Sequence, residues 1–117
     1  MNTLILALSL VAAVLTPTVA QSKLDFTLKN DTGFTIAEVY VSPNTSEDWE
    51  EDIMGKDVLE HGESVDITFS RTDKTCMWDL KIVDEDDKEV EWTQLDLCKA
   101  SHITLQYKGK KATAIIK

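Results

Sequence analysis

Five carboxylates lie on either side of one tryptophan in the segment SEDWEED, residues 46–52. A hard cation such as Ca²⁺ takes several oxygen ligands, and side-chain oxygens gathered in one short loop can supply them. The sequence therefore predicts a calcium site, although the Asp-x-Asp-x-Asp-Gly spacing of an EF-hand is missing. Its ligands would be Asn44, Glu47, Asp48, Glu51 and Asp52.

The same segment also suits contact with a protein partner. Interfaces concentrate binding energy on aromatic side chains that are surrounded by charged residues. Trp49 and Glu50 are therefore predicted to contact a basic partner. A second acidic run, DEDDKE at 84–89, is expected to be a solvated hairpin tip. It would share a cation site with the first run only if both runs lie at one end of the domain.

A short helix would explain much of this pattern without any function. Asn44 can cap a helix, Glu47 follows it at capping-box spacing, and acids suit the positive end of a helix dipole. Trp49 and Ile53 would share one helical face, and Gly55 is placed to end the helix. In that case Trp49 is expected to pack against one end of the core.

Residues 1–20 are predicted to be a signal peptide, because an uncharged apolar run is followed by a proline and small residues. The run is short for a bilayer span, and no later segment is apolar enough to be one. The mature domain would be residues 21–117, and it would be secreted or periplasmic. One disulfide, Cys76–Cys98, is expected there, and closing so short a loop stabilises a domain by about 3 kcal/mol.

Charge and composition limit the functions that the domain can have. The chain contains 12 Lys and Arg against 21 Asp and Glu, a net charge of −9 at pH 7. Nucleic acid and anionic lipid would be repelled, so a basic protein or a divalent cation is the expected partner of a monomeric domain. Catalysis is not expected, because His61 and His102 stand alone and no Gly-x-Ser-x-Gly motif is present.

Apolar residues recur with a period of two over most of the mature chain, as in strands with one buried face. The pattern predicts an all-β fold. We expect an antiparallel β-sandwich, Ig-like or C2-like, with seven or eight strands and one short helical crossover. The strands are expected within residues 24–28, 34–41, 64–70, 76–82, 90–98, 102–107 and 112–116.

The hairpin between the two cysteines has a predicted register. A turn centred on Asp87 would place Cys76 opposite Cys98. The inward phase changes from even-numbered to odd-numbered residues after Trp92. A β-bulge near residues 93–94 would restore the phase, and it would move Cys98 off the face of Cys76.

Three segments resemble a family of small exported single-domain proteins, mostly bacterial: VYVSP at 39–43 ahead of Trp49, CMWDL at 76–80 and LDLC at 95–98. The likeness covers most of residues 24–105. It implies a β-rich fold and an exported compartment, and it implies no particular activity. Members of that family usually have glycine after the tryptophan, where this chain has glutamate.

Two functions are consistent with these features. The first is an exported, non-enzymatic binding module that uses acidic end loops and is stabilised by calcium. The second is an acidic inhibitor or immunity-type protein that caps a basic protein partner, and an exposed Trp49 would favour it. Asn30 and Asn44 also begin Asn-x-Ser/Thr sequons, where a eukaryotic secretory pathway would attach glycans.

Overall fold

The computed structural model describes residues 22–46, 48–49, 52–70 and 73–117, so the predicted signal peptide lies outside the described residues. These ranges form seven strands and contain no helix. Accordingly, they include no helix of the length and apolarity that a membrane crossing needs. The strands are β1 (Phe26–Asp31), β2 (Ile36–Pro43), β3 (Ser64–Ile67), β4 (Met77–Asp84), β5 (Glu89–Asp96), β6 (His102–Lys108) and β7 (Lys111–Ile116).

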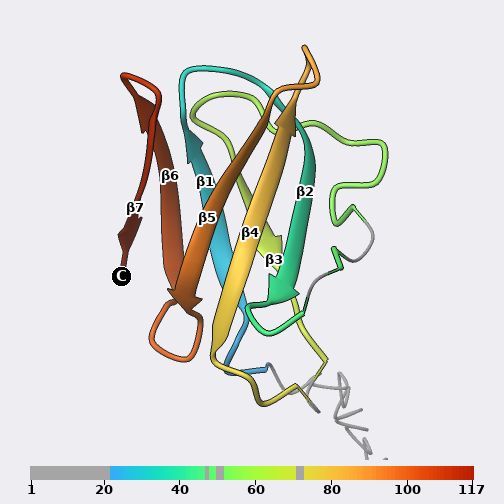
Figure 1. The fold of residues 1–117 in the computed structure, drawn as a ribbon, viewed down its shortest axis with the longest axis vertical. Coiled ribbons are helices and arrows are strands. Elements are labelled where there is room, and N and C mark those ends of the chain that lie inside the picture. Colours follow the sequence, from blue (N-terminus) through green and yellow to red (C-terminus); the bar gives the residue numbers. More distant parts are fainter. Residues whose placement is uncertain (1–21, 47, 50–51, 71–72) are drawn as a thin grey trace, which may run out of the picture.

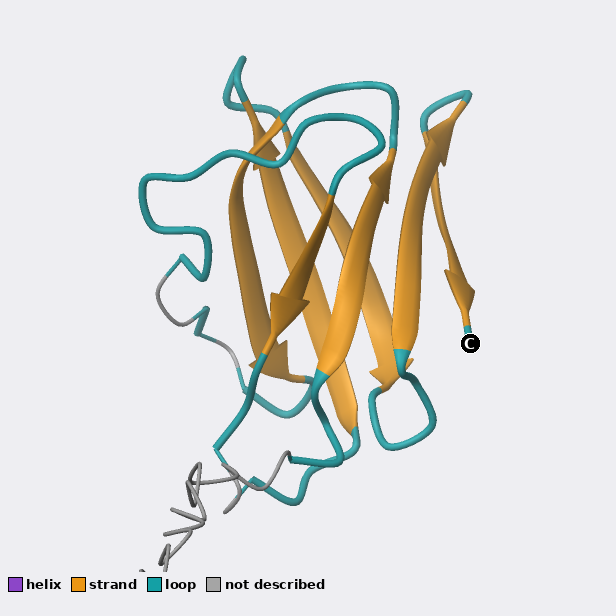
Figure 2. Cartoon of the chain, turned by 180° about the vertical axis from the view of Figure 1, so that it is seen from behind, coloured by secondary structure: helices purple, strands orange, loops and turns teal. Residues whose placement is uncertain are grey.

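The strands form two sheets that pack face to face (Figure 1; Figure 2). One sheet has the order β3-β1-β6-β7, and the other has the order β2-β4-β5. An all-β sandwich is therefore confirmed. The expectation of purely antiparallel pairing is wrong at one place, because β1 and β6 are parallel. After β1 the chain crosses to the second sheet for β2, returns to the first for β3, and crosses again for β4 and β5. β6 then joins the first sheet beside β1 and has the same direction as β1.

The core lies between the two sheets and is built from the alternating apolar residues. In β4, for example, Trp78, Leu80 and Ile82 are buried, as the period of two predicts. Other strands supply buried side chains in the same way, and Leu24 and Leu97 add to the core from turns. The largest fully buried apolar side chains are Leu24, Leu28, Ile36, Ile67, Leu80, Ile82, Leu97, Ile103 and Leu105.

The predicted helical crossover between β2 and β3 is wrong for the part of this connection that the structure describes. After β2 the chain makes a turn in which Ser46 N–H donates to Pro43 O at 2.9 Å. Further on, the connection meets the free edge of β2 at two places, with turns at residues 53–56 between them. Ile53 N–H donates to Val39 O at 2.8 Å, and the backbones of Leu59 and Ile36 exchange two hydrogen bonds of 2.8 Å. An edge strand offers unpaired backbone groups, and this connection satisfies those of Ile36 and the carbonyl of Val39.

The β4–β5 hairpin differs from the predicted register. Ile82 lies opposite Val90, so the turn is centred on Asp86 and not on Asp87. The reason is a short loop of left-handed type, in which Asp87 has φ of 62° and Asp84 N–H donates to Lys88 O at 3.0 Å.

The predicted bulge in β5 is confirmed. Trp78 lies opposite Leu95, but Leu80 lies opposite Trp92, so residues 93–94 of β5 face a single residue of β4. Gln94 has φ of 57°, and its N–H donates to Asp79 Oδ1 at 2.9 Å. The Asp79 carboxylate in β4 thus accepts a hydrogen bond from the Gln94 N–H, which the bulge removes from the ladder.

Candidate functional site

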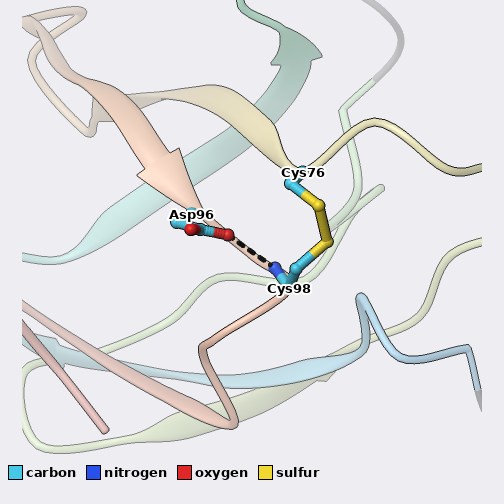
Figure 3. Close-up of side chains that lie close together, drawn as sticks. All are labelled: Cys76, Asp96 and Cys98. Atoms are coloured by element: carbon cyan, nitrogen blue, oxygen red, sulfur yellow. Dashed lines mark hydrogen bonds between the residues drawn. A yellow bond between two sulfur atoms is a disulfide. The ribbon is translucent and has the colours of Figure 1, made fainter.

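The disulfide closes the end of the sandwich where β4 begins and β5 ends (Figure 3). Cys76 and Cys98 are joined, with their Cα atoms 5.1 Å apart, which confirms the predicted pair. Cys98 lies just after β5, in a turn that carries it beside Cys76, while Leu97 N–H donates to Cys76 O at 2.8 Å. The predicted direct opposition of the two cysteines is therefore replaced by an offset of one residue.

These cysteines also belong to the one group of three potential metal-binding side chains found among the described residues. The third member is Asp96, whose Oδ1 accepts a hydrogen bond from Cys98 N–H at 3.1 Å (Figure 3). Because a metal ligand must be a thiolate and both sulfurs are oxidised, this group is structural.

Asp52 fastens the acidic connection to the edge of β2. Its Oδ1 accepts hydrogen bonds from Val39 N–H at 2.8 Å and from Met54 N–H at 3.0 Å. Together with the bond from Ile53 N–H to Val39 O, this fixes residues 52–54 against the middle of β2. One predicted calcium ligand is thus used as a backbone acceptor.

The other predicted calcium ligands divide into two sets. Asn44 and Asp48 are exposed, and the described bonds of Asp48 are made by its backbone, whose carbonyl accepts from the hydroxyls of Ser42 and Ser46. Glu47, Glu51 and the predicted partner contact Glu50 lie outside the described residues. The calcium site therefore stays a prediction.

The two acidic runs of the sequence begin at opposite ends of the smaller sheet. Pro43, which precedes the first run, lies opposite Trp78 near the start of β4. Asp84, which begins the second run, lies opposite Ile36 at the start of β2. Asp84 is buried, and its Oδ1 accepts from the N–H groups of Asp86 and Lys88 at 2.8 Å each. The starts of the two runs therefore do not meet, whereas Trp49 of the first run and Glu89 at the end of the second both lie beside Lys81.

Trp49 lies over the outer surface of the β2-β4-β5 sheet. Lys81 Nζ lies 5.2 Å from the centre of the Trp49 ring and 4.9 Å from the centre of the Tyr40 ring. Trp49 is half-buried and belongs neither to the core cluster nor to the residues packed against it. The expectation that it fills one end of the core is therefore wrong. A cation between two aromatic faces is a favourable arrangement, and the ammonium is shielded there from water.

Two rows of paired residues cross the outer surface of this sheet. The first row is Tyr40, Lys81 and Glu91, and the second is Glu38, Val83 and Glu89. We call the set Glu38, Tyr40, Trp49, Lys81, Glu89 and Glu91 the acidic aromatic face. Lys81 is the one cation in this set, and it is paired with a member of the same set. Its Nζ lies 3.8 Å from Glu89 Oε1, and only 15% of the lysine side chain is exposed.

The field of this face acts on Tyr40. The pKa of its phenol is raised, first by partial desolvation and then by a hydrogen bond with Glu38. The negative charges of Glu38, Asp52 and Glu89 raise this pKa further. Acids from both edges of the sheet therefore act on one phenol, which marks the face as a region of negative potential.

A hollow of about 450 Å³ adjoins the face along the edge of β2. Asp52 and Ile53 belong to its wall on the β2 side. Phe69 and Trp78, whose ring centres are 4.9 Å apart, give it an aromatic wall, and Asp73 adds a second carboxylate. The hollow is therefore suited to an apolar stem that ends in a cation.

The two sequons differ in their surroundings. Asn30 is fully buried, and its Nδ2 donates to Phe34 O at 2.8 Å and to Leu59 O at 2.9 Å. Its Oδ1 accepts from the Thr32 N–H and hydroxyl. A glycan on that nitrogen would remove these bonds, so Asn30 is a structural residue, whereas Asn44 is exposed.

The two histidines are separated in the structure. His61 Nδ1 accepts from Gly33 N–H at 3.0 Å, and its Nε2 lies 3.7 Å from Asp31 at the end of β1. His102 lies opposite Thr27, near the start of β1. The two imidazoles therefore do not converge on one site.

Tyr40 and Lys81 are site residues that the sequence pattern alone did not single out. The signal was available, because both occupy outward positions of strands whose alternate residues are buried. The sequence does not predict that Lys81 lies between Tyr40 and Trp49, because this arrangement depends on how the connection folds back over the sheet.

No protein-family profile, no curated protein and no solved structure matches this chain.

Proposed function

We propose that this protein is an exported, non-catalytic binding module that caps a basic protein partner with its acidic aromatic face. The observation that carries the proposal is the position of Lys81 between Tyr40 and Trp49. Two large rings are held half-exposed on a sheet surface, among carboxylates, instead of packing in the core. Aromatic anchors with a charged rim are the usual centre of a specific interface.

Electrostatics supports the same partner. The net charge of −9 accelerates encounter with a basic protein, and the lone cation of the face is already paired with Glu89. The neighbouring hollow, with Asp52 and Asp73 in its walls, is suited to a lysine or arginine side chain of the partner. This mode of action corresponds to an inhibitor or immunity-type protein.

The exported location is proposed from the apolar leader at residues 1–20, and one disulfide in a small domain fits an oxidising compartment. The intact mass of the protein from its host should show that the leader is missing. A full-length mass in a membrane fraction would contradict this location.

We also propose an Ig-like architecture for the sandwich, supported by its division into four and three strands. The order in which the chain connects the strands differs from that of an Ig domain. Strands β1, β3, β6 and β7 share the larger sheet here, whereas the first, second, fourth and fifth strands do so in an Ig constant-type domain.

The experiment is capture of the partner from the extracellular or periplasmic fraction of the source organism, with the mature protein immobilised. We expect a basic protein to be retained at low salt and released as the salt concentration rises. Retention should be lost with Glu38→Gln/Glu91→Gln and with Trp49→Ala.

The matched control is Asp57→Asn/Glu60→Gln, which removes the same charge from exposed positions outside the face. Retention that responds equally to both double variants would show that net charge alone is responsible. Retention that survives Trp49→Ala would contradict the proposed face.

A further inference from the structure

Within the part of the chain that the structure describes, no strand pairs with the outer edge of β7. β7 ends the order β3-β1-β6-β7, and it pairs with β6 alone (Figure 1; Figure 2). The phase of that ladder follows from Lys117 and His102, whose backbones exchange hydrogen bonds of 2.9 and 3.1 Å. Hydrogen-bonded and non-bonded pairs alternate in an antiparallel ladder, so the N–H and C=O groups of Ala112, Ala114 and Ile116 face away from β6.

This edge is held in place without using those groups. Trp92 Nε1 in β5 donates to Thr113 O at 2.8 Å, which ties β7 to the other sheet. β7 contains no proline and no bulge, two of the devices that block an edge. It does carry Lys111, a charge that discourages pairing with a basic strand but not with an acidic one. A pre-formed row of backbone donors and acceptors is therefore available to an incoming strand.

The chain segment that contains β7 has a charge opposite to that of the rest of the protein. Residues 97–117 contain five lysines and no Asp or Glu, so all 21 acids precede this segment. These lysines are all exposed. They are Lys99, Lys108, Lys110, Lys111 and Lys117.

The side chains of β7 also differ between its two faces. Ala112 and Ala114 are half-buried against the core, and their small size leaves room for larger apolar side chains on an adjacent strand. On the opposite face, Ile115 is 45% exposed, and Lys111 and Lys117 lie at the two ends. An added strand would thus meet an apolar inner side and a basic outer side.

We propose that β7 binds an extended acidic segment of a partner protein, which adds to the four-stranded sheet as its fifth strand. Alternate residues of that segment would be apolar, facing Ala112 and Ala114, and acidic, facing Lys111 and Lys117. A second copy of this chain does not suit the edge, because two paired β7 strands would bring like charges together. This surface lies in the other sheet from the acidic aromatic face and does not depend on it.

The test is a titration of the ¹⁵N-labelled mature protein with a short peptide of alternating glutamate and valine. The amide signals of Ala112, Ala114 and Ile116 should shift most. The same peptide with lysine in place of glutamate should bind about tenfold or more weakly, since charge complementarity becomes repulsion.

Ala114→Pro removes one outward N–H and leaves the β6 ladder intact, because Ala114 belongs to a non-bonded pair. It should weaken binding of the glutamate peptide by about tenfold. Ala114→Ser keeps that N–H and is the matched control. Lys111→Glu/Lys117→Glu tests the charge separately and leaves every backbone donor in place.

Several results would overturn the proposal. One is equal binding of the glutamate and lysine peptides, and another is a shift map centred on residues outside β7. A third is unchanged affinity in both Ala114→Pro and the lysine double variant. A dimer of the protein alone at micromolar concentration, abolished by Ala114→Pro, would assign the edge to a second copy instead.

Discussion

Lys81 Nζ lies 5.2 Å from the ring of Trp49, so the tryptophan of the acidic connection covers a strand that is 32 residues further along the chain. The lysine is only 15% exposed, and the indole is half-buried beside it. This contact joins the acidic connection to the outer surface of the smaller sheet. Because of this contact, Lys81 of β4 and Trp49 of the connection belong to one surface, the acidic aromatic face.

The first prediction concerns the exposure of Trp49. The other two tryptophans, Trp78 and Trp92, are 4% exposed, so Trp49 should account for most of the fluorescence that acrylamide quenches. Trp49→Phe should remove the readily quenched component. Trp92→Phe, the control, should leave it in place, and the opposite pattern would place Trp49 in the core.

The second prediction concerns Tyr40. In a Tyr107→Phe background, absorbance of the tyrosinate should show that the pKa of Tyr40 lies above its ordinary value of about 10. A raised pKa means that the folded state binds the proton more tightly than the unfolded state. The resulting stabilisation is complete below pH of about 10 and is lost as the pH rises through the folded-state pKa.

Glu38→Gln should lower the pKa of Tyr40, because it removes a nearby negative charge and a hydrogen-bonding carboxylate. Glu60→Gln, at an exposed site in the β2–β3 connection, is the control and should leave it unchanged. An equal response to both substitutions would contradict a specific effect of the face.

The third prediction concerns Asp52. Asp52→Ala leaves the N–H groups of Val39 and Met54 without their acceptor and should destabilise the fold by about 1–3 kcal/mol in urea unfolding. Asp52→Asn keeps an acceptor oxygen and should cost less. Asp48→Ala, at an exposed carboxylate, should be close to neutral, and a cost equal to that of Asp52→Ala would refute this role.

The fourth prediction concerns the disulfide. Cys76→Ser/Cys98→Ser should lower the unfolding free energy by about 2–5 kcal/mol, since the bridge restricts the unfolded chain. Peptide mapping without reductant should recover the two cysteine peptides joined to each other. Free thiols in the native protein, or a covalent dimer, would contradict the intramolecular bridge.

The fifth prediction concerns calcium. Asp52 is bound to the backbone and Asp48 is exposed, so millimolar calcium should raise the melting temperature no more than sodium at equal ionic strength. A site that binds calcium would instead add about 2.7 kcal/mol at 100 times its dissociation constant. Such a gain, abolished by Asp48→Asn, would establish the predicted site.

Much of the fold is determined by short stretches of sequence. The alternation of Trp78, Leu80 and Ile82 specifies a strand with one buried face, and the phase change after Trp92 specifies the bulge. The two cysteines lie at the ends of one hairpin and are close for that reason. In each case the cause lies within a hairpin, so local pattern and turn chemistry suffice.

Tertiary structure decided the features that depend on distant segments. Three features follow from how the sheets and their connections pack: the parallel pairing of β1 with β6, the separation of the starts of the two acidic runs, and the position of Trp49 over Lys81. The acidic connection had the signals of a helix, but the edge of β2 offered backbone partners to residues 53 and 59. Hydrogen bonds to a strand already fixed in a sheet outweighed a weak local helix propensity.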